Sequence, residues 1–206
     1  EYNHARRPTL PELPEIQALT EGLEGALIGA RVENAVAWQA ATLKTGRPLD
    51  ELAGRTVTGV RRHGKVVIVD LGDRHVAIHL MSAGCLGLRP VGSSRPGRQA
   101  GFSLDFGDRR LLLTELGTRR RATVHVLDGP ELAAHPPVAR LGPEPIGLAP
   151  EGWRVALASP PGQLHSVLRR GRRIAGIGRC YASEIMWAAR LAPFARTNSL
   201  GLEAWE

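Results

Sequence analysis

The first periodic segment of the chain predicts an amphipathic helix over residues 15–28. Its apolar positions recur at steps of three and four residues, which places them on one helix face; they are Ile16, Leu19, Leu23 and Leu27. Pro14 and Glu15 suit a helix start, because proline is tolerated in the first turn and a carboxylate there complements the helix dipole. Gly29 can end the helix.

Beyond this helix the pattern changes to short runs rich in β-branched and apolar residues. The runs are separated by glycine, aspartate and arginine turns, and they cover residues 32–38, 56–62, 65–71, 75–80, 102–106, 110–114 and 122–127. Gly72-Asp73 between two of the runs is a hairpin signal. Closely spaced strands with little intervening helix predict an antiparallel sandwich or barrel, of which we favour the sandwich.

After Asp128 the pattern is helical again. Helices are expected over residues 131–135, 151–158 and 163–169, and a last one follows the segment 174–185 and ends near Arg190. The sequence therefore predicts an α+β protein with two domains: an antiparallel β-sandwich over residues 11–129 and a helical domain over residues 130–206. Residues 1–10 are polar and lack periodicity, so we expect a disordered tail or a mis-assigned start.

Charge narrows the class of partner. The chain carries a formal net charge of +7 and an isoelectric point near 10.6, which indicates a polyanionic partner such as a nucleic acid. Of its 27 basic residues only Lys44 and Lys65 are lysines. Because a lysine in a shifted environment can give up its proton near neutral pH and an arginine cannot, Lys65 is a candidate for chemistry.

Other features exclude several classes of protein. No apolar run approaches the ~20 residues of a membrane span, and the first residues lack the apolar core of a signal peptide, so we expect a soluble, cytoplasmic protein. Cys85 and Cys180 are too few for a disulfide framework or a zinc site, and we expect both to be buried thiols. The histidines form no close ligand pair with carboxylates, so no metal is expected within this chain.

Two motifs carry candidate chemistry. Pro11 and Glu12 lie just before a helix start, where they can project into a cleft; the alternative interpretation is plain helix capping. Gly176-Ile177-Gly178 precedes another helix and is flanked by arginines, so its backbone N–H groups can face a phosphate. The alternative there is a tight turn between helices.

Taken in order, these motifs resemble one family of DNA-repair enzymes. Pro11–Glu15, Arg61–Lys65, His79–Gly84 and Gly176–Glu184 are similar, over about residues 11–200, to the formamidopyrimidine-DNA glycosylase and endonuclease VIII family. The resemblance implies a bifunctional DNA glycosylase and AP lyase of base-excision repair, which acts as a monomer on double-stranded DNA that holds an oxidised base or an abasic site.

The resemblance also implies roles for individual residues. Pro11 would attack the sugar C1′ through its terminal amine, Glu12 would act as the acid, and Lys65 would contact phosphate and assist β-elimination. Gly176 and Gly178 would belong to a helix-two-turns-helix element, whose donors grip the phosphates around the flipped nucleotide. The other expected DNA contacts are Arg119, Arg120, His165 and Arg179.

This sequence departs from the family pattern at several places. Ten residues precede Pro11, and an amide nitrogen is not a nucleophile, so we expect the working chain to begin at Pro11. The family usually ends in a zinc ribbon, and no cysteine pair follows the helical part here. We therefore expect a chain truncated before the ribbon, with no cofactor in this chain and with zinc possible in a longer, full-length protein. In the family, a wedge of side chains fills the gap that the flipped nucleotide leaves in the base stack. Its methionine is displaced by one position in this sequence, to Met81. The turn that carries its phenylalanine corresponds to Glu115–Arg120, which has no phenylalanine.

Three alternatives to a glycosylase with lyase activity remain at this point. The first is a non-catalytic binder of damaged or abasic DNA. The second is a monofunctional hydrolase in which Glu12 activates water and the strand is not cut. The third is a basic RNA-binding or ribosomal protein, which would not need the combination of Pro11, Glu12 and Lys65.

Overall fold

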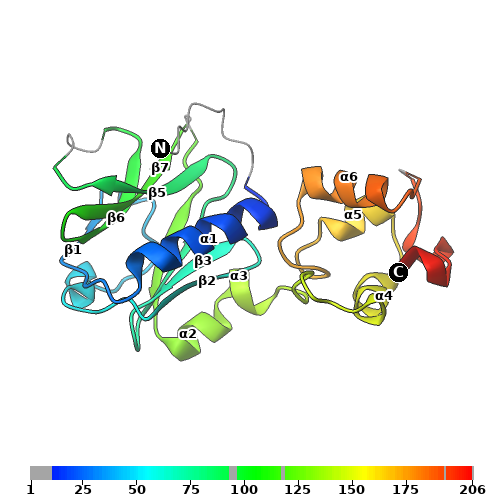
Figure 1. The fold of residues 1–206 in the computed structure, drawn as a ribbon, viewed down its shortest axis with the longest axis horizontal. Coiled ribbons are helices and arrows are strands. Elements are labelled where there is room, and N and C mark those ends of the chain that lie inside the picture. The colour runs from blue at the N-terminus through cyan, green and yellow to red at the C-terminus, as the bar shows by residue number, and fades with distance from the viewer. Residues whose placement is uncertain (1–10, 93–96, 117–118, 193, 206) are drawn as a thin grey trace. The chain divides into compact units, whose positions relative to one another are not determined.

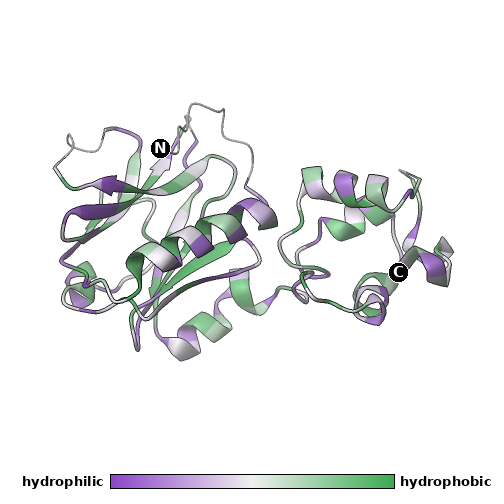
Figure 2. Ribbon diagram, in the orientation of Figure 1, coloured by the Kyte–Doolittle hydropathy of each residue, from purple (hydrophilic) through white to green (hydrophobic). Residues whose placement is uncertain are grey.

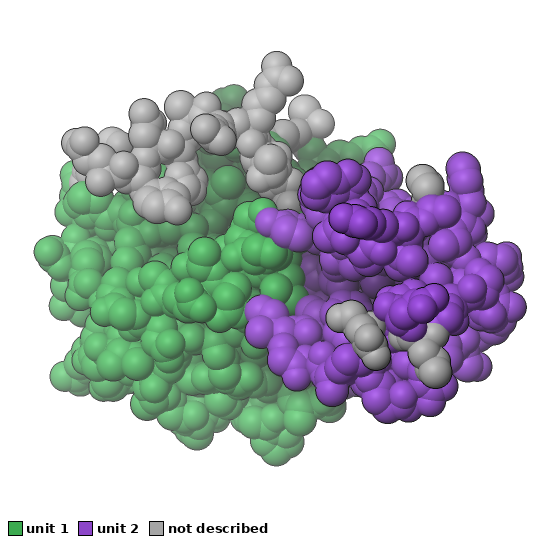
Figure 3. All heavy atoms as spheres, turned by 45° about the vertical axis from the view of Figure 1, so that its right-hand side comes forward, with its two compact units in different colours: residues 1–62, 66–134 green, residues 63–65, 135–206 purple. Residues whose placement is uncertain are grey.

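The computed structural model describes residues 11–92, 97–116, 119–192 and 194–205. It divides into two compact units, residues 1–62 with 66–134 and residues 63–65 with 135–206 (Figure 3). The tail expected over residues 1–10 lies outside the described residues. Each unit is described by itself, and the domain boundaries drawn from the sequence stay predictions.

The predicted N-terminal helix is confirmed as α1 (Leu13–Leu27). It begins two residues earlier than the periodicity indicated, because Glu12 is the N-cap and Pro14 therefore lies at the second helical position. Its buried face consists of Leu13, Ile16, Thr20, Leu23 and Leu27. The helix stops at Ile28, and Gly29 follows with a φ of +78°, a conformation that glycine adopts without steric cost.

Two four-stranded sheets form the rest of the first unit (Figure 1). One has the order β1-β6-β7-β5 and consists of β1 (Asn34–Ala37), β6 (Ala100–Phe106), β7 (Arg109–Glu115) and β5 (Gly84–Pro90). The other has the order β2-β3-β4-β8 and consists of β2 (Gly59–His63), β3 (Val66–Asp70), β4 (His75–His79) and β8 (Thr123–Leu127). The pairings β1–β6, β6–β7, β5–β7, β3–β4 and β4–β8 are antiparallel, and the hairpin predicted at Gly72-Asp73 joins β3 to β4.

Both sheets and α1 contribute to one core. Its largest fully buried side chains include Phe102 and Leu113 from the first sheet, Ile68 and Ile78 from the second, and Ile16 from α1. Helix α1 carries hydrophobic and hydrophilic residues along its length (Figure 2), as a helix with one buried face must. The predicted α+β class with an antiparallel sandwich is therefore confirmed. Short elements α2 (Gly129–Ala134) and η1 (Leu49–Leu52) complete this unit.

Strand β5 was missed in the sequence. Its seven residues, Gly-Cys-Leu-Gly-Leu-Arg-Pro, include two glycines and a proline, which are depleted in strands. All seven pair with β7. Pairing across the sheet overrides the weak local preference at this place.

The second unit is helical. It contains α3 (Pro136–Ala139), α4 (Pro150–Ala158), α5 (Leu164–Leu168), α6 (Arg179–Ala188), η2 (Thr197–Ser199) and η3 (Leu202–Trp205). A separate core joins them, built from Leu157, Leu164, Val167, Leu168, Ile174, Ile177, Ala182 and Met186. The expectation of two buried thiols was wrong, because Cys180 is exposed in the first turn of α6 and Cys85 in β5 is only partly buried. Among the described residues, none of the helices combines the length and the apolar character that crossing a bilayer requires.

Candidate functional site

The N-terminal end of α1 holds two of the predicted site residues. Glu12 is the N-cap of the helix and only 2% exposed. Its backbone N–H donates to Glu15 Oε2 at 3.0 Å, and its carbonyl accepts the N–H of Ile16 at 3.1 Å. These contacts fix the backbone of Glu12 at the first turn, and Pro11 precedes it directly with partial exposure. Glu12 therefore does cap the helix, as the alternative interpretation of this motif held, and the same position gives Pro11 a buried acidic neighbour.

Lys65 lies in a short turn that belongs to the second unit, residues 63–65. Gly64 in this turn has a φ of +54° and is buried. Its N–H donates to Glu144 Oε1 at 2.6 Å. A Cβ atom at position 64 would lie 2.7 Å from Leu141 Cδ1 and 3.5 Å from the backbone nitrogen of Gly176. The turn that carries Lys65 therefore needs a glycine for both conformation and space.

The segment that leads into α6 contains the predicted phosphate-binding glycines. Gly176 is buried with a φ of +77°, and Gly178 is the N-cap of α6. We call residues 174–178 the glycine loop. Because Gly64 packs against the Gly176 backbone, the structure brings the Lys65 turn and the glycine loop together, although they are far apart in the chain. This is the geometry expected of two groups that contact one stretch of phosphate backbone. The helix-two-turns-helix element itself stays a prediction.

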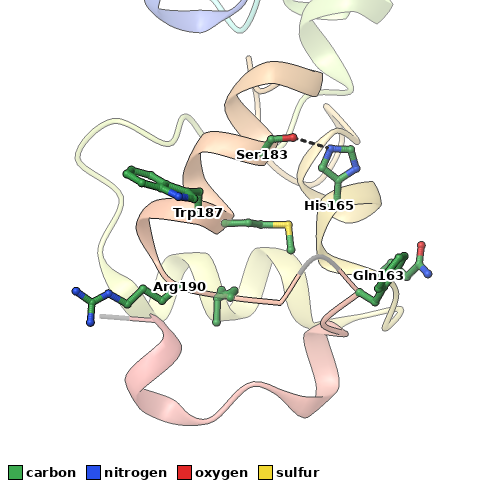
Figure 4. A pocket seen from close by; sticks show the side chains of 8 residues that line it. Gln163, His165, Ser183, Trp187 and Arg190 are labelled. Carbon is green, nitrogen blue, oxygen red and sulfur yellow. Dashed lines mark hydrogen bonds between the residues drawn. The ribbon is translucent and has the colours of Figure 1, made fainter.

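Ser183 of α6 links His165 to the backbone at the start of α6. Ser183 Oγ lies 3.4 Å from His165 Nε2 and donates to the carbonyl of Arg179 at 3.2 Å. His165 and Ser183 also line a pocket of about 650 Å³ (Figure 4), together with Gln163, Met186, Trp187, Arg190, Leu191 and Phe194. Trp187 and Phe194 are 80% exposed. Sequence reasoning missed this pocket, and the available signal was the tryptophan on the outer face of the last helix.

Arg119 and Arg120 lie in the first unit, after the end of β7, and both are exposed. Arg120 donates to the carbonyl of Arg98 at 2.5 Å. Close to them, the buried Glu115 accepts the backbone N–H groups of Arg121 at 2.7 Å and Ala122 at 3.2 Å. This carboxylate holds the chain at the start of β8. It was not singled out in the sequence, although an acid at the end of an apolar strand is a recognisable signal.

The displaced methionine of the wedge motif occupies an unusual conformation. Met81 has a φ of +54° and is 41% exposed, and its N–H donates to His79 Nδ1 at 3.3 Å. A positive φ is uncommon in residues other than glycine. The turn between β4 and β5 therefore presents an apolar side chain at a strained position.

The arginines that flank the glycine loop divide into two groups. Arg169, Arg170, Arg172 and Arg179 are exposed, as binding of a polyanion requires. Arg173 is only partly exposed, and its Nε and Nη2 atoms are buried without a hydrogen-bond partner among the described residues.

Arg173→Leu is therefore expected to raise the free energy of unfolding, by about 1–3 kcal/mol, because an apolar side chain removes the cost of two buried nitrogen atoms that lack hydrogen-bond partners. Urea denaturation measures this change. The control is Arg172→Leu at an exposed position, where a change within about 0.5 kcal/mol is expected. A loss of stability in Arg173→Leu would show that the guanidinium has a stabilising partner.

Among the described residues, no group of three or more His, Cys, Asp or Glu side chains is arranged to hold a metal ion. The candidate groups are thus, in the first unit, an acid and a proline at a helix start with the exposed Arg119 and Arg120, and, in the second unit, a lysine turn joined to a glycine loop with its own exposed arginines. Such a set of groups is suited to binding and acting on a nucleic-acid strand.

The sequence is similar to those of known DNA-repair enzymes. Residues 10–124 match the family model of the formamidopyrimidine-DNA glycosylase N-terminal domain. The formamidopyrimidine-DNA glycosylase of Geobacter sulfurreducens is 32% identical over 199 residues, which cover 94% of this chain and 72% of that protein. The enzyme of Burkholderia thailandensis is 30% identical over 205 residues, covering 96% of this chain and 74% of that protein.

A solved structure shares the fold. The formamidopyrimidine-DNA glycosylase of Lactococcus lactis, bound non-covalently to DNA that contains an abasic site, superposes with a TM-score of 0.84 at 25% identity and covers 94% of this chain and 75% of that one. The fold and the site groups together are those of a DNA-repair protein. The chain belongs to the formamidopyrimidine-DNA glycosylase family.

Proposed function

We propose that this chain is a DNA glycosylase of base-excision repair, which removes an oxidised base from double-stranded DNA and then cleaves the strand at the abasic site. The observation that carries the proposal is the buried carboxyl group of Glu12, held by the first turn of α1 directly after Pro11. Family membership and the abasic-DNA complex of the Lactococcus lactis relative support it.

The chemistry assigns one role to each of three residues. The secondary amine of Pro11 attacks C1′ of the sugar, and the C1′–N bond to the base breaks. Glu12 supplies a proton to the departing base or to the opened sugar. A terminal amine is partly unprotonated at neutral pH, so it can act as the nucleophile. The amine then loses its single proton and its lone pair expels O4′, which opens the sugar ring and takes up a proton; the C1′=N⁺ adduct is a cationic iminium, because its nitrogen has no proton left to lose.

Strand cleavage follows from this cation. The iminium draws electrons from C1′, so the C2′ proton can be removed and the bond between C3′ and its phosphate oxygen breaks by β-elimination. Lys65, on the turn beside Gly176, contacts phosphate and assists the elimination. Gly178, Arg179, His165, Arg119 and Arg120 hold the DNA backbone. Their contacts offset the several kcal/mol that bending the duplex and flipping a base cost.

Borohydride trapping tests the proposal. The 206-residue chain and a chain that begins at Pro11 are each incubated with a duplex that contains an abasic site and with sodium borohydride, which reduces an iminium to a stable covalent bond. An adduct is expected only from the chain that begins at Pro11, because only there is the proline nitrogen an amine.

The other outcomes are equally informative. An adduct formed by the 206-residue chain with Glu1 still in place would show that Pro11 is not the nucleophile. Absence of an adduct from both chains, with DNA binding retained, would favour the non-catalytic binder. Base release without an adduct or a nick would favour the monofunctional hydrolase.

A further inference from the structure

The carboxylate of Glu144 lies at the turn that carries Lys65. Its Oε1 atom accepts the N–H of Gly64 at 2.6 Å and lies 3.7 Å from His63 Nδ1. A hydrogen bond from a backbone N–H to a carboxylate is shorter and stronger than one between neutral groups. Since Gly64 is buried, removing this carboxylate would cost its N–H a charge-assisted hydrogen bond.

The segment that supplies Glu144 is itself bound to the loop that leads to Gly176. The N–H of Gly142 donates to the carbonyl of Gly171 at 2.8 Å, and the N–H of Ala175 donates to the carbonyl of Pro143 at 3.0 Å. Between these two bonds the backbone of Gly142 lies very close to that of Arg173. A Cβ atom on Gly142 would lie 2.3 Å from the carbonyl oxygen of Arg173. Residues 141–144 therefore connect the Lys65 turn to the glycine loop, and we call them the connecting segment.

We propose that Glu144 is a positioning residue that fixes Lys65 relative to Gly176 and Gly178, so that the lysine and the glycine loop address the same stretch of DNA backbone. Glu144 acts through Lys65 and does not touch the reacting atoms. The inference rests on the proposed function, because it assigns Lys65 and the glycines to phosphate contacts. Nothing in the sequence around residue 144 indicated this role.

The test is a double-mutant cycle with Glu144→Ala and Lys65→Ala, in a chain that begins at Pro11. One readout is the rate of strand scission at a preformed abasic site. Glu144→Ala is expected to slow scission roughly 10- to 100-fold, the order of loss caused by a displacement of about 1 Å. In the Lys65→Ala background the same change is expected to cost less than about 3-fold, because the group that Glu144 positions is absent.

A second readout is independent of the chemistry. The equilibrium affinity for an abasic duplex is measured as a function of salt concentration, where loss of one phosphate contact lowers the slope of log K against log salt by about one. Glu144→Ala and Lys65→Ala are each expected to lower it, and the double variant no further. If the parent chain shows no scission at all, the proposed lyase reaction fails, while the salt slopes still decide the role of Glu144.

The matched control is Glu151→Ala. Glu151 is an exposed acid of the same unit, paired with Arg154 in the first turn of α4, and its removal changes the net charge equally. It is expected to leave scission and the salt slope unchanged. If Glu144→Ala fails to fold, Glu144→Gln carries the same cycle, because its amide oxygen still accepts the Gly64 bond with less strength; a melting curve accompanies each variant. Equal losses in both Lys65 backgrounds, or no loss, would overturn the proposal.

Discussion

Replacing Glu12 with glutamine is expected to abolish the excision of an intact oxidised base, by about 10²- to 10⁴-fold, and to leave residual cutting at preformed abasic sites. The amide is far too weak an acid to protonate the departing base, whereas an abasic site has no base left to remove. The fold should tolerate the change, because glutamine has nearly the same shape as glutamate in this 2% exposed position. In the capping box the Glu12 side chain accepts the backbone N–H of Glu15, and the amide oxygen of glutamine can still accept it.

Single-turnover assays on two duplexes, one with an oxidised base and one with an abasic site, separate the two steps. The control is Glu15→Gln, which leaves the Glu12 carboxyl group in place and keeps an amide oxygen that can accept the N–H of Glu12. It is expected to change stability by about 1 kcal/mol or less and to retain excision. Unchanged excision in Glu12→Gln would remove Glu12 from the acid role. Equal loss on both duplexes would assign it to a step that follows base release.

The second large effect is expected in the connecting segment. Gly142→Ala places a Cβ atom 2.3 Å from the carbonyl oxygen and 2.4 Å from the carbonyl carbon of Arg173. Both are backbone atoms of a loop that leads into the second core, so neither can move away as the end of a side chain can. The segment must shift, and the bond from Gly142 to Gly171 is lost with it. We expect a loss of about 3 kcal/mol or more in the free energy of unfolding.

Denaturation curves in urea measure this loss, and Gly25→Ala is the matched control. Gly25 lies in α1, is exposed, and has no neighbouring atom within 4 Å of the position that a Cβ atom would take. Alanine there is expected to stabilise the protein by about 0.5–1 kcal/mol, because glycine loses more conformational freedom in a helix. If both substitutions had the same small effect, the close approach of the connecting segment to Arg173 would be wrong.

Much of the fold could be predicted where neighbours in the chain determine it. The steps of three and four residues from Ile16 to Leu27 predicted α1, because a helical period places these side chains on one face. The two-residue turn at Gly72-Asp73 predicted the β3–β4 hairpin, because turn chemistry sets the pairing of adjacent strands. Strand β5 could not be predicted in this way, since its partner β7 is not adjacent in the chain and its own residues favour turns.

Among the candidate site residues, too, some could be predicted from their neighbours in the chain and others depend on contacts with distant residues. Pro11, Glu12, Lys65 and the two glycines could be selected in the sequence because each belongs to a short motif with a recognisable order. Glu115 was overlooked, although an acid at the end of an apolar strand is a recognisable signal. Glu144 could not be selected, because its contact with the Gly64 N–H lies outside any local motif. The lysine turn and the glycine loop were both candidates, but nothing in their spacing indicated that Gly64 would pack against Gly176.

By itself, the sequence determined the period of each element, the turns, the basic charge and the order of the motifs, since these depend on residues close together in the chain. Only the tertiary structure decided which buried groups meet. Gly64, Glu144 and Gly176 are brought into one arrangement by packing and by the need to pair buried N–H groups, and neither of these is a property of any one segment.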